Sequence, residues 1–448
     1  MRDRYDCYWS VVVVAGLGFV GLTLAVSLAN VGYKVLGVDT NLNILAAINE
    51  AKPHFHEVGL EPLLRYELAE GRFRAANELR EAADVYIIAV GTPVTDKGEP
   101  ILDSLRHAAE MVGRVLKRNE IVMIRSTVPV GSTREFILPI LERESGLSGG
   151  RDFQIVFAPE RTIEGRALQE LRTLPQIIGG IDDYSEEMAV RVFNRLAPNT
   201  VRVNGLEAAE MVKLVNNSFR DVSFAFANEL ALICDAWGLD AFKVVEAANS
   251  GYPRNPVPLP SPGVGGICMA KDPFIYVSAG RAKGYEPILP IYGRQINTCM
   301  VDHVAGKVSD FFSRHHLSPA GRKVLVMGFA FKGEPETSDI RKSVTLDLLP
   351  LLKQMGAEVW GYDPAANVEE IAALGVNTVD RYSLETGFQN ADAVLVMNNH
   401  SSYNRIDLFQ LLSRLNRPGL FFDGWHMFSK HEVERIQGIE YIGISGAL

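Results

Sequence analysis

The sequence predicts an α/β protein with two Rossmann-like, doubly wound domains joined by a central all-helical connector with a long helix. Three observations predict it. A strand, a tight turn, a helix and a second strand follow one another within residues 11–39, a similar pattern returns near residue 316, and a long apolar helical stretch lies between them. A chain of 448 residues is too long for one core. We therefore expect domains at residues 1–203, 204–315 and 316–448.

The first domain opens on the strand "VVVV", whose lack of polar alternation is typical of a parallel strand covered on both faces. Gly16, Gly18 and Gly21 follow with G-x-G-x-x-G spacing, then a helix that we expect to end near Asn30 and a strand that ends at Asp39. Further strand-like stretches are "ADVYIIAVGTPV", "EIVMIRSTVPVG", "FQIVFAPE" and "LPQIIGGID". Their alternation with helical stretches predicts a doubly wound sheet.

The glycine pattern in this context predicts a dinucleotide site. The glycines permit a tight turn, close approach of a pyrophosphate and close packing of helix on strand, while the helix N-terminus faces the negative charge. The carboxylate of Asp39 would bind a ribose diol and repel a 2′-phosphate, which favours NAD over NADP. A doubly wound domain without a cofactor is the alternative that this context disfavours.

After the first domain we expect one long helix from Leu206 to about Trp237, apolar over most of its surface. A proline-dense loop, "YPRNPVPLPSPGVGG", and a second helix near residues 284–314 follow, and "HHLSPAGR" is typical of a linker. The later stretches "KVLVMGFAFKG", "GAEVWGYDP" and "ADAVLVMN" repeat patterns of the first domain. They predict the second Rossmann-like domain.

Composition indicates which partners and which cellular location to expect for the protein. A net charge of −9 disfavours nucleic acid as a partner, and no apolar run reaches the roughly 20 residues of a membrane helix. The four cysteines are scattered, with neither metal-ligand spacing nor a small scaffold to crosslink. We expect a cytoplasmic protein that uses no metal, nucleic acid or membrane.

Cys268 stands out because it lies in the glycine-rich stretch "GVGGICMAKDP", which we expect to be a loop. A small apolar thiol is usually core material, whereas a thiol on an exposed loop near charges is typical of a reactive site. On the long helix, Lys213, Asn217 and Arg220 form a polar line among apolar residues. A solvated face is the common fate of such a line, but these neighbours favour a polar cavity with an anion.

Two further segments end strands and leave their roles open. Glu160 and Glu164 in "APERTIEG" would accept protons, bind a ribose or face a helix N-terminus, and they share a face if the segment is helical. Ser126 and Thr127 in "RSTVPVG" would cap a helix or position a ligand.

A bound NAD together with a reactive thiol suggests one reaction sequence. Oxidation of an alcohol gives an aldehyde, addition of the thiolate restores a tetrahedral carbon that can lose a second hydride, and the resulting thioester is hydrolysed to an acid. An inert loop cysteine is the alternative.

With these segments in order along the chain, the sequence resembles the UDP-glucose/GDP-mannose dehydrogenase family. The matching segments are "GLGFVG", "GTPV", "STVPVG", "APERTIEG", "EMVKLVNNSFRD", "GVGGICMAKDP" and "GFAFKGEPETSDIR". The resemblance implies oxidation of the C6 alcohol of a nucleotide sugar to a carboxylate with two NAD.

The resemblance also implies roles for individual residues. Cys268 would be the nucleophile, Lys213 and Asn217 would stabilise the oxyanion, Asp272 would assist proton handling, and Glu160 and Thr127 would position the hydrolytic water. Contacts to NAD are implied for Gly16, Gly18, Phe19, Val20, Gly21, Asp39, Thr92, Pro93, Thr127, Glu164 and Arg341. Contacts to the sugar nucleotide are implied for Lys213, Asn217, Arg220, Arg254, Gly263, Gly265, Phe331 and Lys332.

Some features depart from the family pattern. Lys332 and Arg341 lie farther apart than the family commonly places them, and Ile267 precedes the cysteine where histidine or serine is frequent. "NNSFRD" and "APERTIEGRALQELRTLPQIIGG" resemble the branch that oxidises UDP-N-acetyl-D-mannosamine, with Arg220 as a reader of the sugar 2-substituent or a brace for a dimer. Lys271, by contrast, is typical of enzymes for UDP-glucose.

Rival substrates are UDP-glucose, UDP-N-acetylglucosamine and GDP-mannose. A two-electron dehydrogenase and a sugar-nucleotide or NAD-binding protein without turnover are rivals of other kinds. The apolar connector helix and the family both imply a homodimer, with Arg254 reaching the partner's substrate.

Overall fold

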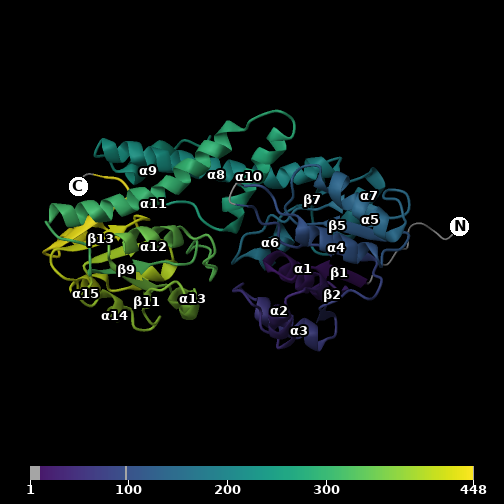
Figure 1. Cartoon of the computed structure of the whole chain (residues 1–448), viewed down its shortest axis with the longest axis horizontal. Helices are drawn as coiled ribbons and strands as arrows, with labels where there is room; N and C mark the ends of the chain where they lie inside the picture. The colour runs from purple at the N-terminus through teal and green to yellow at the C-terminus, as the bar shows by residue number, and fades with distance from the viewer. Residues whose placement is uncertain (1–10, 96–97, 447–448) are drawn as a thin grey trace. The chain divides into compact units, whose positions relative to one another are not determined.

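The computed structural model describes residues 11–95 and 98–446, which form two compact units (Figure 1). The first unit takes the described residues up to 216 together with 274–286, and the second takes 217–273 together with 287 onward. Two helices, α8 (Leu206–Ala236) and α10 (Ile267–Arg281), contribute residues to both units.

The first unit is built on an eight-stranded sheet in the order β3-β2-β1-β4-β5-β6-β7-β8. All neighbouring strands are parallel except β6 and β7. The order of the first six strands is that of the Rossmann fold, as predicted. The strands are β1 (Val11–Ala15), β2 (Lys34–Val38), β3 (Phe73–Ala76), β4 (Val85–Ile88), β5 (Ile121–Ile124), β6 (Gln154–Phe157), β7 (Gln176–Gly180) and β8 (Thr200–Arg202).

Helices cover both faces of this sheet. One core joins the sheet to α1 (Phe19–Asn30), α2 (Leu42–Asn49), α3 (Leu60–Ala69), α6 (Ala167–Thr173) and α7 (Asp183–Phe193). The other joins it to α4 (Asp103–Gly113), a π-helical turn (Thr133–Ile137), α5 (Leu138–Ser145) and the start of α8. Val12 and Val14 enter the first core, Val13 and Ala15 the second. Because β1 is buried on both faces, its valines need no polar alternation.

The second unit contains a six-stranded, fully parallel sheet in the order β11-β10-β9-β12-β13-β14. Numbered from its own first strand, this is again the Rossmann order, and the predicted second Rossmann-like domain is confirmed. Its strands are β9 (Lys323–Met327), β10 (Glu358–Tyr362), β11 (Asn377–Thr378), β12 (Ala393–Val396), β13 (Gly419–Asp423) and β14 (Ile439–Gly443).

Two cores also flank the second sheet. One contains residues of α8, α9 (Ala241–Asn249), α11 (Ile288–Arg314), α12 (Val344–Gln354) and α13 (Val368–Ala372). The other contains residues of α14 (Leu384–Phe388), a 3₁₀ turn (Ser401–Arg405), α15 (Leu408–Leu412) and α16 (Lys430–Glu434). The predicted long helix is α8, with 31 residues.

The predicted loop around Cys268 is wrong, because α10 begins at Ile267 and places the cysteine in its first turn. Within the glycine-rich run, Gly263 and Gly266 have positive φ angles. Gly266 is the residue directly before α10, so the backbone becomes helical immediately after it. Pro273 lies inside α10 and removes only one backbone donor. None of the helices in the described residues is both long and apolar enough to cross a bilayer.

Candidate functional site

The turn between β1 and α1 in the first unit carries the three predicted glycines. Gly16 has φ +92°, and a Cβ on Gly21 would lie 1.7 Å from the carbonyl oxygen of Gly16. A Cβ on Gly18 would meet no atom within 4 Å, and no side chain caps the N-terminus of α1. The turn is therefore tight at two glycines, open at the third, and backed by uncapped N–H groups, which suits a pyrophosphate. Phe19 and Val20 form the first turn of α1.

Asp39 lies beside this turn, immediately after β2. Its Oδ2 accepts a hydrogen bond from the N–H of Leu17 at 2.7 Å, and its Oδ1 accepts one from the N–H of Asn41 at 2.8 Å. A carboxylate offers about four acceptor positions, so this fixed side chain retains capacity for ribose hydroxyls.

The loops after β4 and β5 are joined by hydroxyl groups. Thr92 Oγ1 donates to the carbonyl oxygen of Thr127 at 2.5 Å, and Ser126 Oγ donates to that of Val90 at 2.7 Å. The hydroxyl of the buried Ser126 thus ties the two loops together and does not cap a helix. Thr92, the adjacent Pro93 and Thr127 are brought together at the carboxyl edge of the sheet, where open α/β sheets bind ligands.

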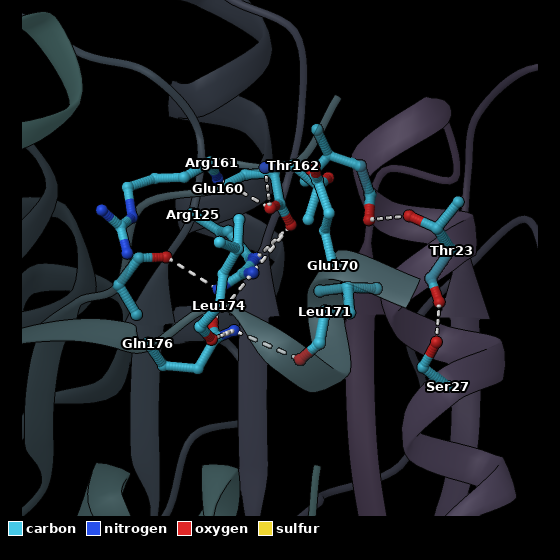
Figure 2. Close-up of polar contacts among 12 residues, drawn as sticks. Thr23, Ser27, Arg125, Glu160, Arg161, Thr162, Glu170, Leu171, Leu174 and Gln176 are labelled. Atoms are coloured by element: carbon cyan, nitrogen blue, oxygen red, sulfur yellow. Dashed lines mark hydrogen bonds and ion pairs between the residues drawn. The ribbon is translucent and has the colours of Figure 1, made fainter. Parts of the chain in front are cut away.

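Glu160, after β6, is held by four donors (Figure 2). Its Oε2 accepts hydrogen bonds from Arg125 Nη2 at 2.7 Å and Nε at 3.1 Å. Its Oε1 accepts the N–H groups of Arg161 at 2.7 Å and Thr162 at 2.8 Å. Two bonds to each oxygen use the usual acceptor capacity of a carboxylate. The segment 158–166 is not helical, so Glu160 and Glu164 do not share a helix face.

The charge of Glu160 follows from competing effects. Burial raises the pKa of this carboxyl, but the charge of Arg125, the N–H of Thr162 and the charge of Lys213 outweigh burial and lower the pKa overall. Glu160 is therefore an anion at neutral pH. Lys213 is itself buried, and it forms no ion pair within 4.0 Å anywhere in residues 11–95 and 98–446.

Carboxylates also bind the backbone of the loop that carries Glu164. Glu170 Oε2 accepts the N–H of Ile163 at 2.8 Å, and the buried Glu57 accepts the N–H groups of Gly165 at 2.7 Å and Ala167 at 2.8 Å. This irregular loop thereby satisfies its backbone donors without a ladder or helix.

Cys268 in the second unit is exposed, whereas Cys234 is buried and Cys299 half-buried. Its position in the first turn of α10 places it near the backbone N–H groups of the helix N-terminus and the positive end of the helix dipole. Such surroundings favour a thiolate and so a nucleophile.

Asp272 lies one turn after Cys268 on α10 and is fully buried. One carboxylate oxygen accepts a hydrogen bond from Asn217 Nδ2 at 2.5 Å, and the other pairs with Lys271 Nζ at 2.7 Å. The carboxylate thus orients the amide of Asn217, a predicted site residue, and the ammonium of Lys271.

The predicted substrate loops meet within the second unit. The N–H of Gly266 donates to the carbonyl oxygen of Lys342 at 2.9 Å. A Cβ on Gly263 would lie 2.9 Å from Val344, one on Gly265 2.5 Å from Lys342, and one on Gly266 2.7 Å from the ring of Phe331. Residues 263–266 therefore pack closely on the segment that contains Phe331 and Lys332.

Three further predicted residues lie on exposed surface. Arg341 pairs with Asp339 at 2.7 Å, Arg254 contacts Tyr252, and Arg220 stacks on Phe224. The sequence reasoning also missed Arg125 and Glu57. A signal existed for Arg125, which directly follows the buried run "IVMI", a place where an unpaired charge is costly.

No group of three or more His, Cys, Asp or Glu side chains among the described residues is arranged to hold a metal ion.

Three consecutive parts of the chain match domains of one family. Residues 10–197 match the NAD binding domain of the UDP-glucose/GDP-mannose dehydrogenase family, 207–298 its central domain and 325–430 its UDP binding domain.

Individual relatives cover nearly the whole chain. A UDP-N-acetyl-D-mannosamine dehydrogenase of Pyrococcus horikoshii is 31% identical over 94% of this chain and 97% of its own length. An NDP-N-acetyl-D-galactosaminuronic acid dehydrogenase of Ralstonia nicotianae is 32% identical over 93% and 96%. Among solved structures, the UDP-D-ManNAc dehydrogenase of Pyrococcus horikoshii gives a TM-score of 0.87 at 30% identity, covering 97% of this chain and 99% of its own. A UDP-glucose dehydrogenase of Pyrobaculum islandicum gives 0.84 at 27% identity, covering 99% of each.

Proposed function

The chain belongs to the UDP-glucose/GDP-mannose dehydrogenase family and is an NAD-dependent nucleotide-sugar dehydrogenase, and from this premise we propose that it oxidises the C6 hydroxyl of a UDP-sugar to a carboxylate through a thioester on Cys268. The observation that carries the proposal is the exposed thiol in the first turn of α10, one turn before the buried carboxylate of Asp272. A protein that only binds a sugar nucleotide needs neither group.

NAD, when bound, accepts one hydride in each of two oxidations, and the open Gly18 and fixed Asp39 fit this cofactor. The residues of the chain do the rest. The thiolate of Cys268 adds to the C6 aldehyde, and Lys213 and Asn217, one turn apart on α8, donate to the developing oxyanion.

Hydrolysis completes the reaction, because water must displace Cys268 from the thioester. We assign Thr127 and Glu160 to the positioning of this water. Since both oxygens of Glu160 already accept two hydrogen bonds, Glu160 acts on the water through its negative charge and not by accepting a hydrogen bond from it.

We propose UDP-N-acetyl-D-mannosamine as the substrate. Relatives of that name support the choice, as does Arg220, which is available on the exposed side of α8 to read the 2-acetamido group. Contacts to the UDP portion are assigned to Gly263, Gly265, Phe331 and Lys332.

The test is NADH counting on a panel of UDP-N-acetyl-D-mannosamine, UDP-glucose, UDP-N-acetylglucosamine and GDP-mannose. We expect two NADH per molecule of the first sugar. One NADH per sugar would indicate a two-electron dehydrogenase, no NADH a binding protein, and a signal from UDP-glucose alone would overturn the substrate assignment.

Replacement of the thiol tests the route. Cys268→Ala should lower acid formation by about three orders of magnitude or more, because no thioester can form, while NAD and sugar-nucleotide binding persist in calorimetry. Cys299→Ala, which removes a half-buried thiol of the same unit, is the matched control. Full activity in Cys268→Ala would rule out the thioester.

A homodimer is part of the proposal, with Arg254 reaching the substrate of the partner subunit. It is supported by an exposed apolar row on α8, formed by Phe219, Phe226 and Ile233, and by the exposed Trp237 directly after the helix. We also propose the cytoplasm as its location, because a nucleophilic thiol must remain reduced.

A further inference from the structure

We propose that Arg125 is a positioning residue for the hydrolytic half of the reaction, because it captures Glu160 and so leaves the buried ammonium of Lys213 free for the substrate. This inference rests on the proposed function, in which Lys213 stabilises an oxyanion. It assigns a role to a buried arginine of the first unit that has no direct part in the chemistry.

The side chain of Arg125 is only 1% exposed and is tied on several sides (Figure 2). Besides its two bonds to Glu160, Nη1 donates to the carbonyl oxygen of Ala158 at 3.1 Å and Nη2 to Gln176 Oε1 at 3.2 Å. Its guanidinium carbon lies 5.4 Å from the ring centroid of Phe193. Another rotamer would leave buried donors unpaired, so the guanidinium is a rigid anchor.

Glu160 needs such an anchor because burial alone would protonate it or drive it toward another cation. The charged groups around it are Arg125 after β5, Arg161 in its own loop and Lys213 on α8. The side chain of Arg161 is turned to the carbonyl oxygen of Pro175 at 2.7 Å, and Glu170 on α6 is bound to Ile163. Arg125 is thus the side chain that directly holds the Glu160 carboxylate.

The anchoring of Glu160 by Arg125 determines which partners remain for the ammonium of Lys213. A carboxylate saturated by four donors gains little by swinging to the ammonium, so Lys213 acts on Glu160 through its charge without pairing with it directly. In hydrolysis, water adds to the thioester carbon, the C–S bond breaks, and sulfur leaves with the electron pair as thiolate. The products are carboxylate, thiolate and two protons, and the intermediate oxyanion needs an unpaired donor such as Lys213.

The experiment is a double-mutant cycle with Arg125→Met and Glu160→Gln, read by single-turnover hydrolysis of the thioester formed on the full-length enzyme. Arg125→Met should slow hydrolysis about 100-fold, with KM for NAD within about 2-fold of the wild type. The double variant should be no more than about 3-fold slower than Glu160→Gln alone, because Arg125 acts through Glu160. Arg118→Met, which removes an exposed arginine paired with Asp152, is the control.

The pH profile separates positioning from a merely structural role. In Arg125→Met the burial of Glu160 loses its strongest opponent, so the pKa of the carboxyl should rise and hydrolysis should increase with pH between about 5 and 8 more steeply than in the wild type. Arg125→Lys keeps the charge and should recover at least about 10-fold of the lost rate.

Several outcomes would overturn the inference. They are a folded Arg125→Met enzyme with the wild-type rate and pH profile, or losses that multiply in the double variant. If Arg125→Met does not fold, Arg125→Lys carries the test, and an Arg125→Lys enzyme whose hydrolysis is more than about 10-fold slower than that of the wild type overturns it, because the retained charge should hold Glu160. The proposed function stands or falls separately, by Cys268→Ala.

Discussion

Glu210, one turn before Lys213 on α8, is the residue with the most consequential titration. Its carboxylate accepts the N–H groups of Gly131 at 2.5 Å and Thr133 at 2.8 Å, and the Thr133 hydroxyl at 2.6 Å. Burial raises the pKa of Glu210 from 4.5 to about 7, against the lowering effect of the Thr133 and Gly131 bonds. The carboxyl that ties α8 to the "VGST" segment therefore changes charge near neutrality.

This titration predicts that stability falls as pH rises. Between pH 4.5 and about 7 the unfolded chain loses the Glu210 proton while the folded chain retains it, so the free energy of unfolding decreases by up to about 3 kcal/mol across this window. Denaturant unfolding at several pH values gives the free energy of unfolding at each pH. This free energy should decrease less steeply with pH in Glu210→Gln than in the wild type. Parallel slopes in the two proteins would contradict the assignment.

For single residues, the sequence predicted the features that depend on the spacing of residues close together in the chain. The turn geometry of Gly16, Gly18 and Gly21 and the place of Asp39 agree with their pattern. The partners of Glu160 could not be predicted, because Arg125 lies far from it in the sequence and the contact exists only once β5 and β6 pair. The same holds for Glu57, which accepts a hydrogen bond from the N–H of Gly165, more than a hundred residues later in the sequence.

Among the elements, α10 shows how local signals mislead. Glycine density and Pro273 both argue against a helix over the cysteine segment, yet the helix starts directly after Gly266. The periodicity of α8 and α11 was reliable, because long helices repeat their signal over many turns. Short elements such as β3 and β8 carry too few residues for a pattern and were missed.

The exposed face of α8 yields a prediction for assembly. Phe219, Phe226 and Ile233 recur every seven residues and are 73%, 57% and 53% exposed. Covering one such side chain contributes about 1.5–3 kcal/mol, so Phe226→Glu should weaken the proposed dimer at least about 10-fold. Sedimentation at micromolar concentration should show a shift from two chains to one. Tyr382→Glu, at an exposed aromatic outside α8, is the control, and an unchanged mass for Phe226→Glu would refute this interface.

The two sheets of the chain share the order of their first six strands, but the residues that follow their first two strands differ in structure. "GLGFVG" follows β1 and "GFAFKG" follows β9, and the second strand of each sheet is followed by an aspartate, Asp39 or Asp363. Asp363, however, is buried, and its oxygens accept the N–H groups of Phe329, Ala330, Ala365 and Ala366. Helix α12 begins only at Val344, well after the turn. Among the described residues of the second unit, this turn therefore has neither the available carboxylate nor the adjoining helix N-terminus of a dinucleotide site.

One NAD per chain is the expected stoichiometry. Calorimetric titration of the full-length protein should give a single class of NAD sites, and Asp39→Ala should weaken binding about 10-fold through loss of the ribose contact. Asp363→Asn, if folded, serves as the control and should leave NAD affinity unchanged. Two equivalents of NAD, or an unaffected Asp39→Ala, would contradict this division between the units.

The irregular loop after β6 has a path set by its main chain. Its amides are fastened by Glu57, Glu160 and Glu170, so the course of the loop owes little to the identities of most side chains along it. Loss of any one of the three glutamates would release backbone amides of the loop, whereas changing most of the side chains between Arg161 and Arg166 would leave these bonds in place.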